Sequence, residues 1–478
     1  MSLNQWTRRG VLSGIGASLA LPALAKVKKP AAKPVPTAPQ TTADLMAQAN
    51  LTGVTGFCVA EVATGKVLES FHADQLVPPA SVAKTITSLY ALDQLGEDHQ
   101  FATRIMANGS VSGGRLAGDL ILAGGGDPTL DTDTLGDMVA ALARTGLKQV
   151  TGRFLIYAGA LPSFDRITDE QPVQVGFDPG LSGLSLNFNR VNMEWTKGGA
   201  TLAMTARGDR YVPVVQGITV AVADRDLPTF TYADGERWTV ARPALAKLGS
   251  RWLPVRQPAA YAAEVFATLC AAQGIALPKG QVIGAVPAGA TVLLTWPSAH
   301  LKDILRDMLK YSTNITAETM GLSASGAGDL RGSASAMQAW AQGNLGLAAK
   351  FVDHSGLGAA SRVTAGGMMQ ALMAGERRAS GANFRGLLKQ VGVKGKDATG
   401  SKTRVFVKSG TLNFVSGLVG FIEPASGRDL CFAIFSADPA RREAVPIAQR
   451  EQPPGEHGWV GRAHVMQAGL IARWAGMV

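Results

Sequence analysis

The chain has 478 residues, which is longer than a single hydrophobic core usually supports, so two or more domains are expected. Its composition, with 46% hydrophobic and 17% charged residues, excludes a disordered or collagen-like protein. The net charge is +10, but residues 1–40 carry six Lys or Arg and no acidic residue, so the remainder carries about +4 (+10 − 6). This mild basicity argues against nucleic acid as a partner.

The N-terminal segment has the features of an export signal. Arg8 and Arg9 precede a Gly- and Ala-rich run that is short for a membrane span, and an Ala-Leu-Ala sequence ends at Ala25. We expect residues 1–25 to be a twin-arginine signal peptide, with an uncleaved anchor as the alternative, and the mature protein to be periplasmic. Residues 26–41 are rich in Pro and Lys and predict a linker that associates weakly with anionic envelope surfaces.

Strand-like sequences occur at both ends of the folded part. "TGFCVAEVATGKVLESF" predicts a hairpin, and "RVFVKSGTL", "VSGLVGFIE" and "DLCFAIF" predict three further strands. Helical sequence lies between them, so the expected fold is α+β, with an antiparallel sheet built from both ends of the chain and flanked by helices. Cys58 and Cys431 lie in two of these runs and can be neighbours in the sheet, and we expect buried free thiols.

The first helical stretch contains the segment "PPASVAKTITSLYAL", in which Lys84 is the only charged residue. Residues three apart share one face of a helix, so Ser81 and Lys84 can meet. A serine needs a base to become a nucleophile, and burial lowers the pKa of a lysine so that it can be that base. The alternative is that Lys84 extends into solvent from a helix that Ser81 caps.

A second helical stretch occupies residues 300–325 and includes "YSTNITAE". At the end of its apolar part, Ser312 offers a hydroxyl for proton relay and Asn314 offers an amide that can orient a substrate. A polar turn between helix and loop is the alternative interpretation of this segment.

A third motif lies on the predicted strand "RVFVKSGTL". The Lys408 ammonium and the hydroxyls of Ser409 and Thr411 can hold a carboxylate, and Gly410 leaves room for a substrate against the strand edge. An exposed edge strand that a lysine protects from aggregation is the alternative.

The three motifs together form the ordered set Ser-x-x-Lys, Ser-x-Asn and Lys-[Ser/Thr]-Gly of the penicillin-recognising serine enzymes. Ser81 and Ser312 are 231 positions apart (312 − 81), which argues against a small β-lactamase. We expect one or two extra domains inserted at residues 101–254, within a discontinuous catalytic domain formed by residues 42–100 and 255–478.

The chain resembles the D-alanyl-D-alanine carboxypeptidases/endopeptidases of the penicillin-binding protein 4 type, serine peptidase family S13. The resemblance extends from about residue 42 to the C-terminus and includes "GDLILAGGGDPTL", "LSGLSLNFNRV", "YSTNITAE" and "DHSGLGAASRVT" in the order of that family. The resemblance implies a DD-peptidase/β-lactamase-like fold. No cofactor is expected, and the six histidines form no metal-binding spacing.

The resemblance also implies roles for the motif residues. Ser81 would be the acylated nucleophile and Lys84 its general base. Ser312 would pass a proton to the leaving D-alanine nitrogen, and Asn314 would help to bind the peptide. Lys408 would supply positive charge that helps to keep Lys84 neutral and that attracts the terminal carboxylate of the substrate.

The remaining implied roles concern the strand motif and its surroundings. The hydroxyls of Ser409 and Thr411 would bind the carboxylate, and the backbone N–H groups of Ser81 and Thr411 would form the oxyanion hole. Two departures from the family pattern stand out: Ser409 replaces the commoner threonine, and "LLKQVGVKGKDATGSKTRVFVKSG" replaces a Leu-Pro-x-Ala-Gly-x-Asp-Gly-Thr-like stretch. The second departure leaves substrate preference open.

These observations predict a periplasmic DD-peptidase that acts on peptidoglycan stem peptides and is covalently inhibited by β-lactam antibiotics. A β-lactamase or esterase of the same fold is one alternative, since it differs in how fast water removes the acyl group. A non-catalytic cell-wall binding protein is another, although all three motifs retain their functional groups.

Overall fold

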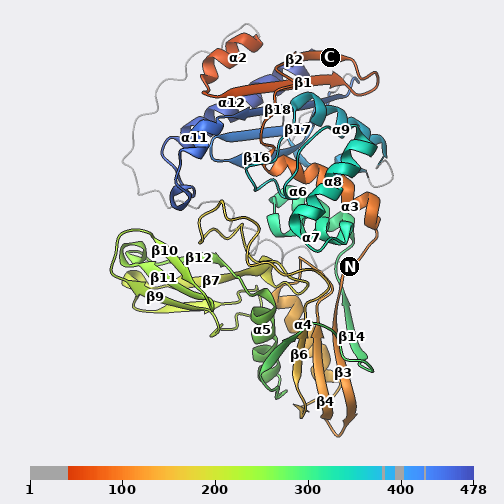
Figure 1. Cartoon of the computed structure of the whole chain (residues 1–478), viewed down its shortest axis with the longest axis vertical. Helices are drawn as coiled ribbons and strands as arrows, with labels where there is room; N and C mark the ends of the chain where they lie inside the picture. The colour runs from red at the N-terminus through yellow and green to blue at the C-terminus, as the bar shows by residue number, and fades with distance from the viewer. Residues whose placement is uncertain (1–40, 379–382, 393–402, 425–426, 478) are drawn as a thin grey trace.

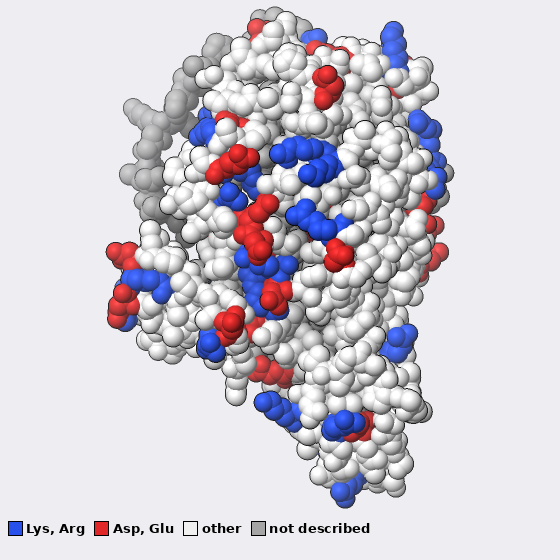
Figure 2. All heavy atoms as spheres, viewed as in Figure 1, with Lys and Arg blue, Asp and Glu red and all other residues white. Residues whose placement is uncertain are grey.

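The computed structural model describes residues 41–378, 383–392, 403–424 and 427–477. The expected signal peptide and all of the expected linker except Thr41 lie outside these residues. Within the described ranges, no helix combines the length and the apolar character needed to cross a membrane. On the face shown in Figure 2, basic and acidic side chains lie intermixed across the middle of the molecule.

The main sheet is built from both ends of the chain, as predicted (Figure 1). All of its neighbouring strands are antiparallel. Their order is β15 (Lys389–Val391), β16 (Arg404–Leu412), β17 (Val415–Glu423), β18 (Leu430–Ala437), β1 (Val54–Glu61) and β2 (Val67–Phe71). Cys431 pairs with Ala60 across β18 and β1, and the three cysteines are buried free thiols.

Helices cover both faces of this sheet because successive side chains of a strand point to opposite faces. Phe57 and Phe432 contribute to a core with α2 (Thr42–Ala49) and α12 (Glu456–Ala475). Cys58 and Ala433 face the opposite core. That core also contains residues of α3 (Lys84–Leu95), α6 (Leu301–Tyr311), α7 (Asn314–Ser325), α8 (Leu330–Leu345), α9 (Ala365–Arg378) and α10 (Phe384–Leu387).

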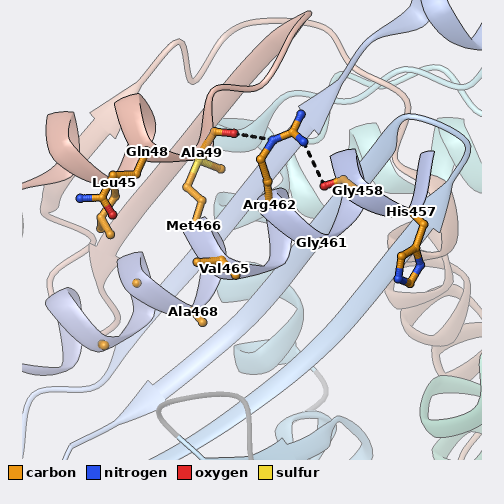
Figure 3. Close-up of a pocket in the computed structure, with 12 residues that line it drawn as sticks. Leu45, Gln48, Ala49, His457, Gly458, Gly461, Arg462, Val465, Met466 and Ala468 are labelled. Carbon is orange, nitrogen blue, oxygen red and sulfur yellow. Dashed lines mark hydrogen bonds between the residues drawn. The ribbon is translucent and has the colours of Figure 1, made fainter. Parts of the chain in front are cut away.

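A groove of about 680 Å³ lies between α2 and α12 (Figure 3). Leu45 and Ala49 line it from α2, and small residues such as Gly461 and Ala468 line it from α12. In this packing the Arg462 guanidinium donates a hydrogen bond to the Ala49 carbonyl. The groove is on the sheet face away from α3 and contributes no residue to the site described below.

The helical stretch predicted at residues 300–325 is two helices. The helix α6 ends at Tyr311, and α7 begins at Asn314. Between them Ser312 has a left-handed backbone conformation with φ 61° and ψ 37°, which no α-helix can continue through. A continuous helix would place Ser312 and Asn314, two positions apart, on nearly opposite faces, whereas the break lets both side chains reach the same site.

The inserted region forms separate sheets below the main one (Figure 1). Two sheets have three strands each, β10 (Phe230–Ala233), β11 (Arg237–Ala241) and β9 (Thr219–Ala223) in one, and β12 (Gly249–Pro254), β7 (Arg190–Trp195) and β8 (Leu202–Thr205) in the other. The largest contains β13 (Gly280–Ile283), β6 (Phe154–Tyr157), β4 (Arg115–Ala123), β3 (Ala102–Ser112) and β14 (Thr291–Pro297), with β5 (Gln149–Val150) beside β4. Helices α4 (Thr132–Arg144) and α5 (Pro258–Ala272) pack against each other.

The strand pairing indicates a later end of the insertion than residue 254, the end predicted from the sequence. β13 pairs with β6, and β14 pairs with β3, so both continue the sheet that β3 begins. Ser298 then donates its backbone N–H to the carbonyl of Phe101, which brings the two ends of the insertion together. We therefore propose residue 297 as the end of the insertion. The sequence indicated an earlier end because β13 and β14 are short and their local patterns do not reveal their partner strands.

Candidate active site

Ser81 lies on a short 3-10 turn, Ala80–Ala83, which leads directly into α3. Strand β16 packs closely against this turn at Gly410. A Cβ atom added to Gly410 would lie 2.8 Å from the backbone nitrogens of both Ser81 and Val82. The absent side chain was expected to make room for a substrate; in the structure it makes room for the backbone of the nucleophile.

Lys84 is fully buried, so the alternative in which it extends into solvent is wrong. Its Nζ atom lies 2.9 Å from Ser81 Oγ, 2.7 Å from Asn314 Oδ1 and 2.7 Å from the carbonyl oxygen of Ser355. Burial lowers the pKa of Lys84 to about 7, although the charges of Glu318 and Asp353 oppose this shift. A substantial fraction of Lys84 is therefore neutral near pH 7.

The three contacts of Lys84 determine where its lone pair points. A neutral amine has two N–H bonds and one lone pair. The Asn314 amide donates its Nδ2–H to the carbonyl of Phe177 at 2.9 Å, which directs its Oδ1 toward Lys84. Asn314 Oδ1 and the Ser355 carbonyl can only accept, so they take both N–H bonds. The lone pair is left for the hydroxyl of Ser81, which then donates to Lys84.

Lys408 lies beside this group on β16 and is also buried. Its Nζ donates to Ser312 Oγ at 3.0 Å and to the carbonyl of Ser409 at 2.5 Å. Burial first, and then the charge of Lys84, lowers the pKa of Lys408 well below its usual value. For Lys84 too, burial is the largest cause of the lowered pKa, as the uncharged sequence around it predicted.

Ser409 and Thr411 are exposed on β16. They follow Val407, the last residue of β16 that pairs with β15, so this part of the strand has an open edge. The structure thus brings Ser81, Lys84 and Asn314 into one hydrogen-bonded group and pairs Ser312 with Lys408, near enough for the charge of Lys84 to act on Lys408. The Ser409 and Thr411 hydroxyls are left open to a ligand.

Two buried carboxylates beneath Lys84 were not predicted. Glu318 accepts hydrogen bonds from the backbone N–H of Ser355 at 2.8 Å and from that of His354 at 3.1 Å. Asp353 accepts from the backbone N–H of Gly356 at 2.7 Å and from that of Gly358 at 2.6 Å. Burial raises the pKa of both carboxyls, and the neighbouring Asp353 raises the pKa of Glu318 further, to about 8.

Both carboxylates lie in segments that carry the family resemblance, Glu318 in "YSTNITAE" and Asp353 in "DHSGLGAASRVT", but neither was assigned a role. Glu318 follows Asn314 by four positions in α7 and therefore shares its helix face. Asp353 and Ser355 are more than 260 positions from Lys84 in the chain, and no local pattern links them. The inserted region also contributes, since Phe177 holds Asn314 through its carbonyl.

A polar cavity of about 300 Å³ lies next to this network. The inserted region lines one side with Arg166 and Glu170, and the N-terminal end of α8 lines another with Arg331. Asp353 also borders the cavity. The cavity thus presents charged groups of both signs, and Asp353 connects it to the buried network beneath Lys84.

Known proteins that are similar to this chain share both its sequence and its fold. The model of the D-Ala-D-Ala carboxypeptidase 3 (S13) family matches residues 39–452. A D-alanyl-D-alanine carboxypeptidase of Actinomadura sp. (strain R39) is 30% identical over 426 residues, which cover 80% of this chain and 77% of that protein. A carboxypeptidase of Mycobacterium tuberculosis, Rv3627c, is 26% identical over 81% of this chain and 77% of its own length.

A solved structure has the same architecture. Penicillin-binding protein 4 of Haemophilus influenzae superposes with a TM-score of 0.74 at 20% identity, covering 91% of this chain and 99% of that one. The α+β fold of the penicillin-recognising enzymes, predicted above, is therefore confirmed. The chain belongs to the D-Ala-D-Ala carboxypeptidase 3 (S13) family, whose members are serine-type hydrolases.

Proposed function

We propose that this protein is a periplasmic, penicillin-binding DD-peptidase that acts on peptidoglycan stem peptides through an acyl-enzyme on Ser81, without a cofactor. It would release terminal D-alanine, cleave D-alanyl cross-links, or do both. The observation that carries the proposal is the buried Lys84 amine, whose lone pair is left for Ser81. The periplasmic location and twin-arginine export rest on the sequence of residues 1–25.

Acylation begins when Lys84 takes the Ser81 proton as Oγ attacks the carbonyl carbon of the penultimate D-alanine. The resulting oxyanion is stabilised by the backbone N–H groups of Ser81 and Thr411. The C–N bond then breaks, and the leaving D-alanine nitrogen receives a proton through the hydroxyl of Ser312. The Lys408 amine, which donates a hydrogen bond to Ser312 Oγ, orients that hydroxyl for this transfer. Water activated by Lys84 later hydrolyses the ester and regenerates Ser81.

The substrate binds along the open edge of β16, after Val407. The Ser409 and Thr411 hydroxyls bind the terminal carboxylate of the peptide, to which Lys408 contributes positive charge. Asn314 orients the peptide amide. Replacing the commoner threonine by Ser409 removes one methyl group and keeps the hydroxyl, so we expect little change in mechanism. The stretch before β16 that departs from the family pattern includes residues 393–402, which lie outside the described ranges.

β-Lactam antibiotics are proposed to acylate the same serine. One structure of the H. influenzae penicillin-binding protein 4, with a TM-score of 0.68, contains a bound β-lactam. The ring amide of a penicillin presents a carbonyl and a nearby carboxylate, as a D-alanyl-D-alanine terminus does. The basic linker, residues 26–41, is proposed to associate weakly with anionic envelope surfaces.

The proposal is tested by mass spectrometry of the protein after exposure to penicillin. We expect the wild type to gain the mass of one intact penicillin on Ser81 and a Ser81→Ala variant to gain none. No adduct on the wild type, or an equal adduct on Ser81→Ala, would contradict the mechanism. Rapid loss of the adduct with release of hydrolysed drug would instead identify a β-lactamase, and D-alanine release from a stem pentapeptide measures the peptidase directly.

A further inference from the structure

The loop that follows α8 places a carbonyl group against the general base. Residues 353–358, called the 353–358 loop here, contain Ser355, whose carbonyl oxygen lies 2.7 Å from Lys84 Nζ. The position of this carbonyl matters because it takes one of the two N–H bonds of the neutral amine. If it moved away, the amine could rotate and its lone pair would no longer be directed at Ser81.

Glu318 holds this loop at the residue that contacts Lys84. Its Oε1 accepts the backbone N–H of Ser355 at 2.8 Å, and its two oxygens accept that of His354 at 3.1 and 3.2 Å. Glu318 is fully buried, so water cannot replace these bonds. Ser355 is thus tied to Glu318 through its N–H and to Lys84 through its carbonyl.

Close packing and further hydrogen bonds also hold the 353–358 loop in place. Gly356 has φ +75°, and a Cβ atom there would lie 1.8 Å from the carbonyl oxygen of Ala80. Asp353 closes the turn by accepting the N–H groups of Gly356 and Gly358. A small movement of the loop would therefore displace both the Lys84 contact and the residue that precedes Ser81.

We propose that Glu318 is a positioning residue of the acylation step, which holds Ser355 so that the lone pair of Lys84 is directed at the Ser81 hydroxyl. This inference rests on the proposed function, because it assigns Glu318 a part in acylation of Ser81. Glu318 itself touches neither the nucleophile nor the substrate. Its carboxyl acts through its acceptor oxygens, and a neutral acceptor of the same shape therefore retains part of the effect.

The ionisable groups around Lys84 favour a neutral Glu318 carboxyl. Lys84 is faced by Glu318 from α7, Asp353 from the 353–358 loop and Lys408 from β16, and Glu170 of the inserted region acts on Asp353. Burial and the charge of Asp353 raise the pKa of Glu318, which favours its protonated, neutral form. Glutamine is then a close isostere of Glu318, whereas alanine removes the acceptors.

The experiment compares the acylation rate constant and the non-covalent binding constant for a fluorescent penicillin in three variants. For Glu318→Ala we expect about a 10²-fold loss in the acylation rate constant with unchanged binding, since a displacement near 1 Å of a catalytic group costs that much. For Glu318→Gln we expect recovery of about tenfold relative to Glu318→Ala, because the acceptor that holds Ser355 is retained.

The matched control is Glu236→Ala in the inserted region. Glu236 is also buried and accepts two backbone N–H bonds, from Arg256 at 2.6 Å and Gln257 at 2.7 Å. It shares the stability cost of losing a buried acceptor, and we expect its acylation rate to match the wild type. The melting temperature of each variant identifies any that fail to fold, in which case Glu318→Gln alone decides.

Two outcomes would overturn the inference. Folded Glu318→Ala could acylate at the wild-type rate, or Glu318→Gln could lose activity through weaker penicillin binding with an unchanged acylation rate constant. Either would leave the proposed function intact if the wild type still forms its Ser81 adduct. Absence of that adduct in the wild type would instead remove the proposed function itself, so the two failures are distinguishable.

Discussion

Lys84 shows how one residue acquires its chemistry from its surroundings. The amine has no carboxylate partner among the ion pairs of the described residues, and its Nζ meets a hydroxyl, an amide oxygen and a backbone carbonyl. Burial of an ammonium without an ion pair is costly, so the neutral form is favoured. Burial destabilises the ammonium form of Lys84, and for this reason the amine can act as a base near neutral pH.

The acylation rate should therefore depend on pH through Lys84. Only the neutral amine can take the Ser81 proton, and its pKa is lowered to about 7. We expect the rate constant for penicillin acylation to reach a plateau above about pH 8 and to fall about tenfold per pH unit below pH 6, as protonation removes the base. A stopped-flow profile that stays flat between pH 5 and pH 8 would contradict this assignment.

The Lys84→Arg variant keeps a positively charged side chain at position 84 but removes the group that can accept a proton. The guanidinium keeps its proton at all accessible pH values, so no lone pair is available for Ser81. We expect acylation to fall by about 10²–10⁴-fold, the usual contribution of general-base catalysis, while the protein still unfolds cooperatively. Normal labelling of Lys84→Arg by fluorescent penicillin would show that another group takes the proton.

At the level of elements, the site depends on two interruptions of regular structure. The break between α6 and α7 sends Ser312 toward Lys408 and Asn314 toward Lys84. The 3-10 turn before α3 presents Ser81 where β16 crosses it at Gly410. Each interruption brings side chains from different elements to one point.

Gly410→Ala tests the packing of β16 on the turn that carries Ser81. The new Cβ atom would lie 2.8 Å from the nitrogens of Ser81 and Val82, so the strand or the turn must move. We expect a loss of about 1–3 kcal/mol in the free energy of unfolding, as for other overpacked sites. We also expect at least tenfold slower acylation, because the nucleophile shifts.

The matched control is Gly343→Ala in α8. No heavy atom lies within 4 Å of the Cβ position at Gly343. Alanine in an exposed helix is favoured over glycine by about 0.5–1 kcal/mol, so this variant should be slightly more stable and should acylate normally. Equal behaviour of the two variants in urea denaturation would mean that β16 has room at Gly410.

The inserted region and the catalytic region contact each other at both sides of the site. Phe177 holds Asn314, and Arg450 donates to the carbonyl of Glu170 at 2.9 Å. Next to Arg450, Glu451 accepts from Gln174 and from Arg251 of the inserted region. Asn413, beyond Thr411 on the β16–β17 turn, donates to the carbonyl of Arg450. The C-terminal segment thus connects the strand motif to the insertion.

A double-mutant cycle on Arg251 and Glu451 measures one of these contacts. Both side chains are partly exposed, at 26% and 32%, so solvent screens their attraction. We expect a coupling energy of about 0.2–1 kcal/mol from the unfolding of Arg251→Ala, Glu451→Ala and the double variant. It should decrease as salt is raised, and a coupling above about 3 kcal/mol would indicate that the contact behaves as a buried ion pair.

Local patterns in the sequence were enough to predict the three motifs, all strands of the main sheet except β15, and an insertion. A strand, a hairpin or a Ser-x-x-Lys spacing is encoded within a few residues, so it can be recognised without knowledge of the fold. Ser81 and Lys84 are three positions apart, so their spacing alone predicted the contact that the structure has. The catalytic roles of Ser81, Lys84, Ser312, Asn314 and Lys408 stay predictions.

The contacts that hold Lys84 and Asn314 in position could not be predicted from local patterns. Ser355 lies 271 positions from Lys84, and Phe177 lies 137 positions from Asn314, so their contacts depend on how distant elements pack. The break at Ser312 and the pairing of β13 and β14 with the insertion also come from long-range contacts that override local helix and strand signals. Residue types and their order are local properties, whereas burial, lone-pair direction and the pKa of Lys84 arise only when the chain has folded around it.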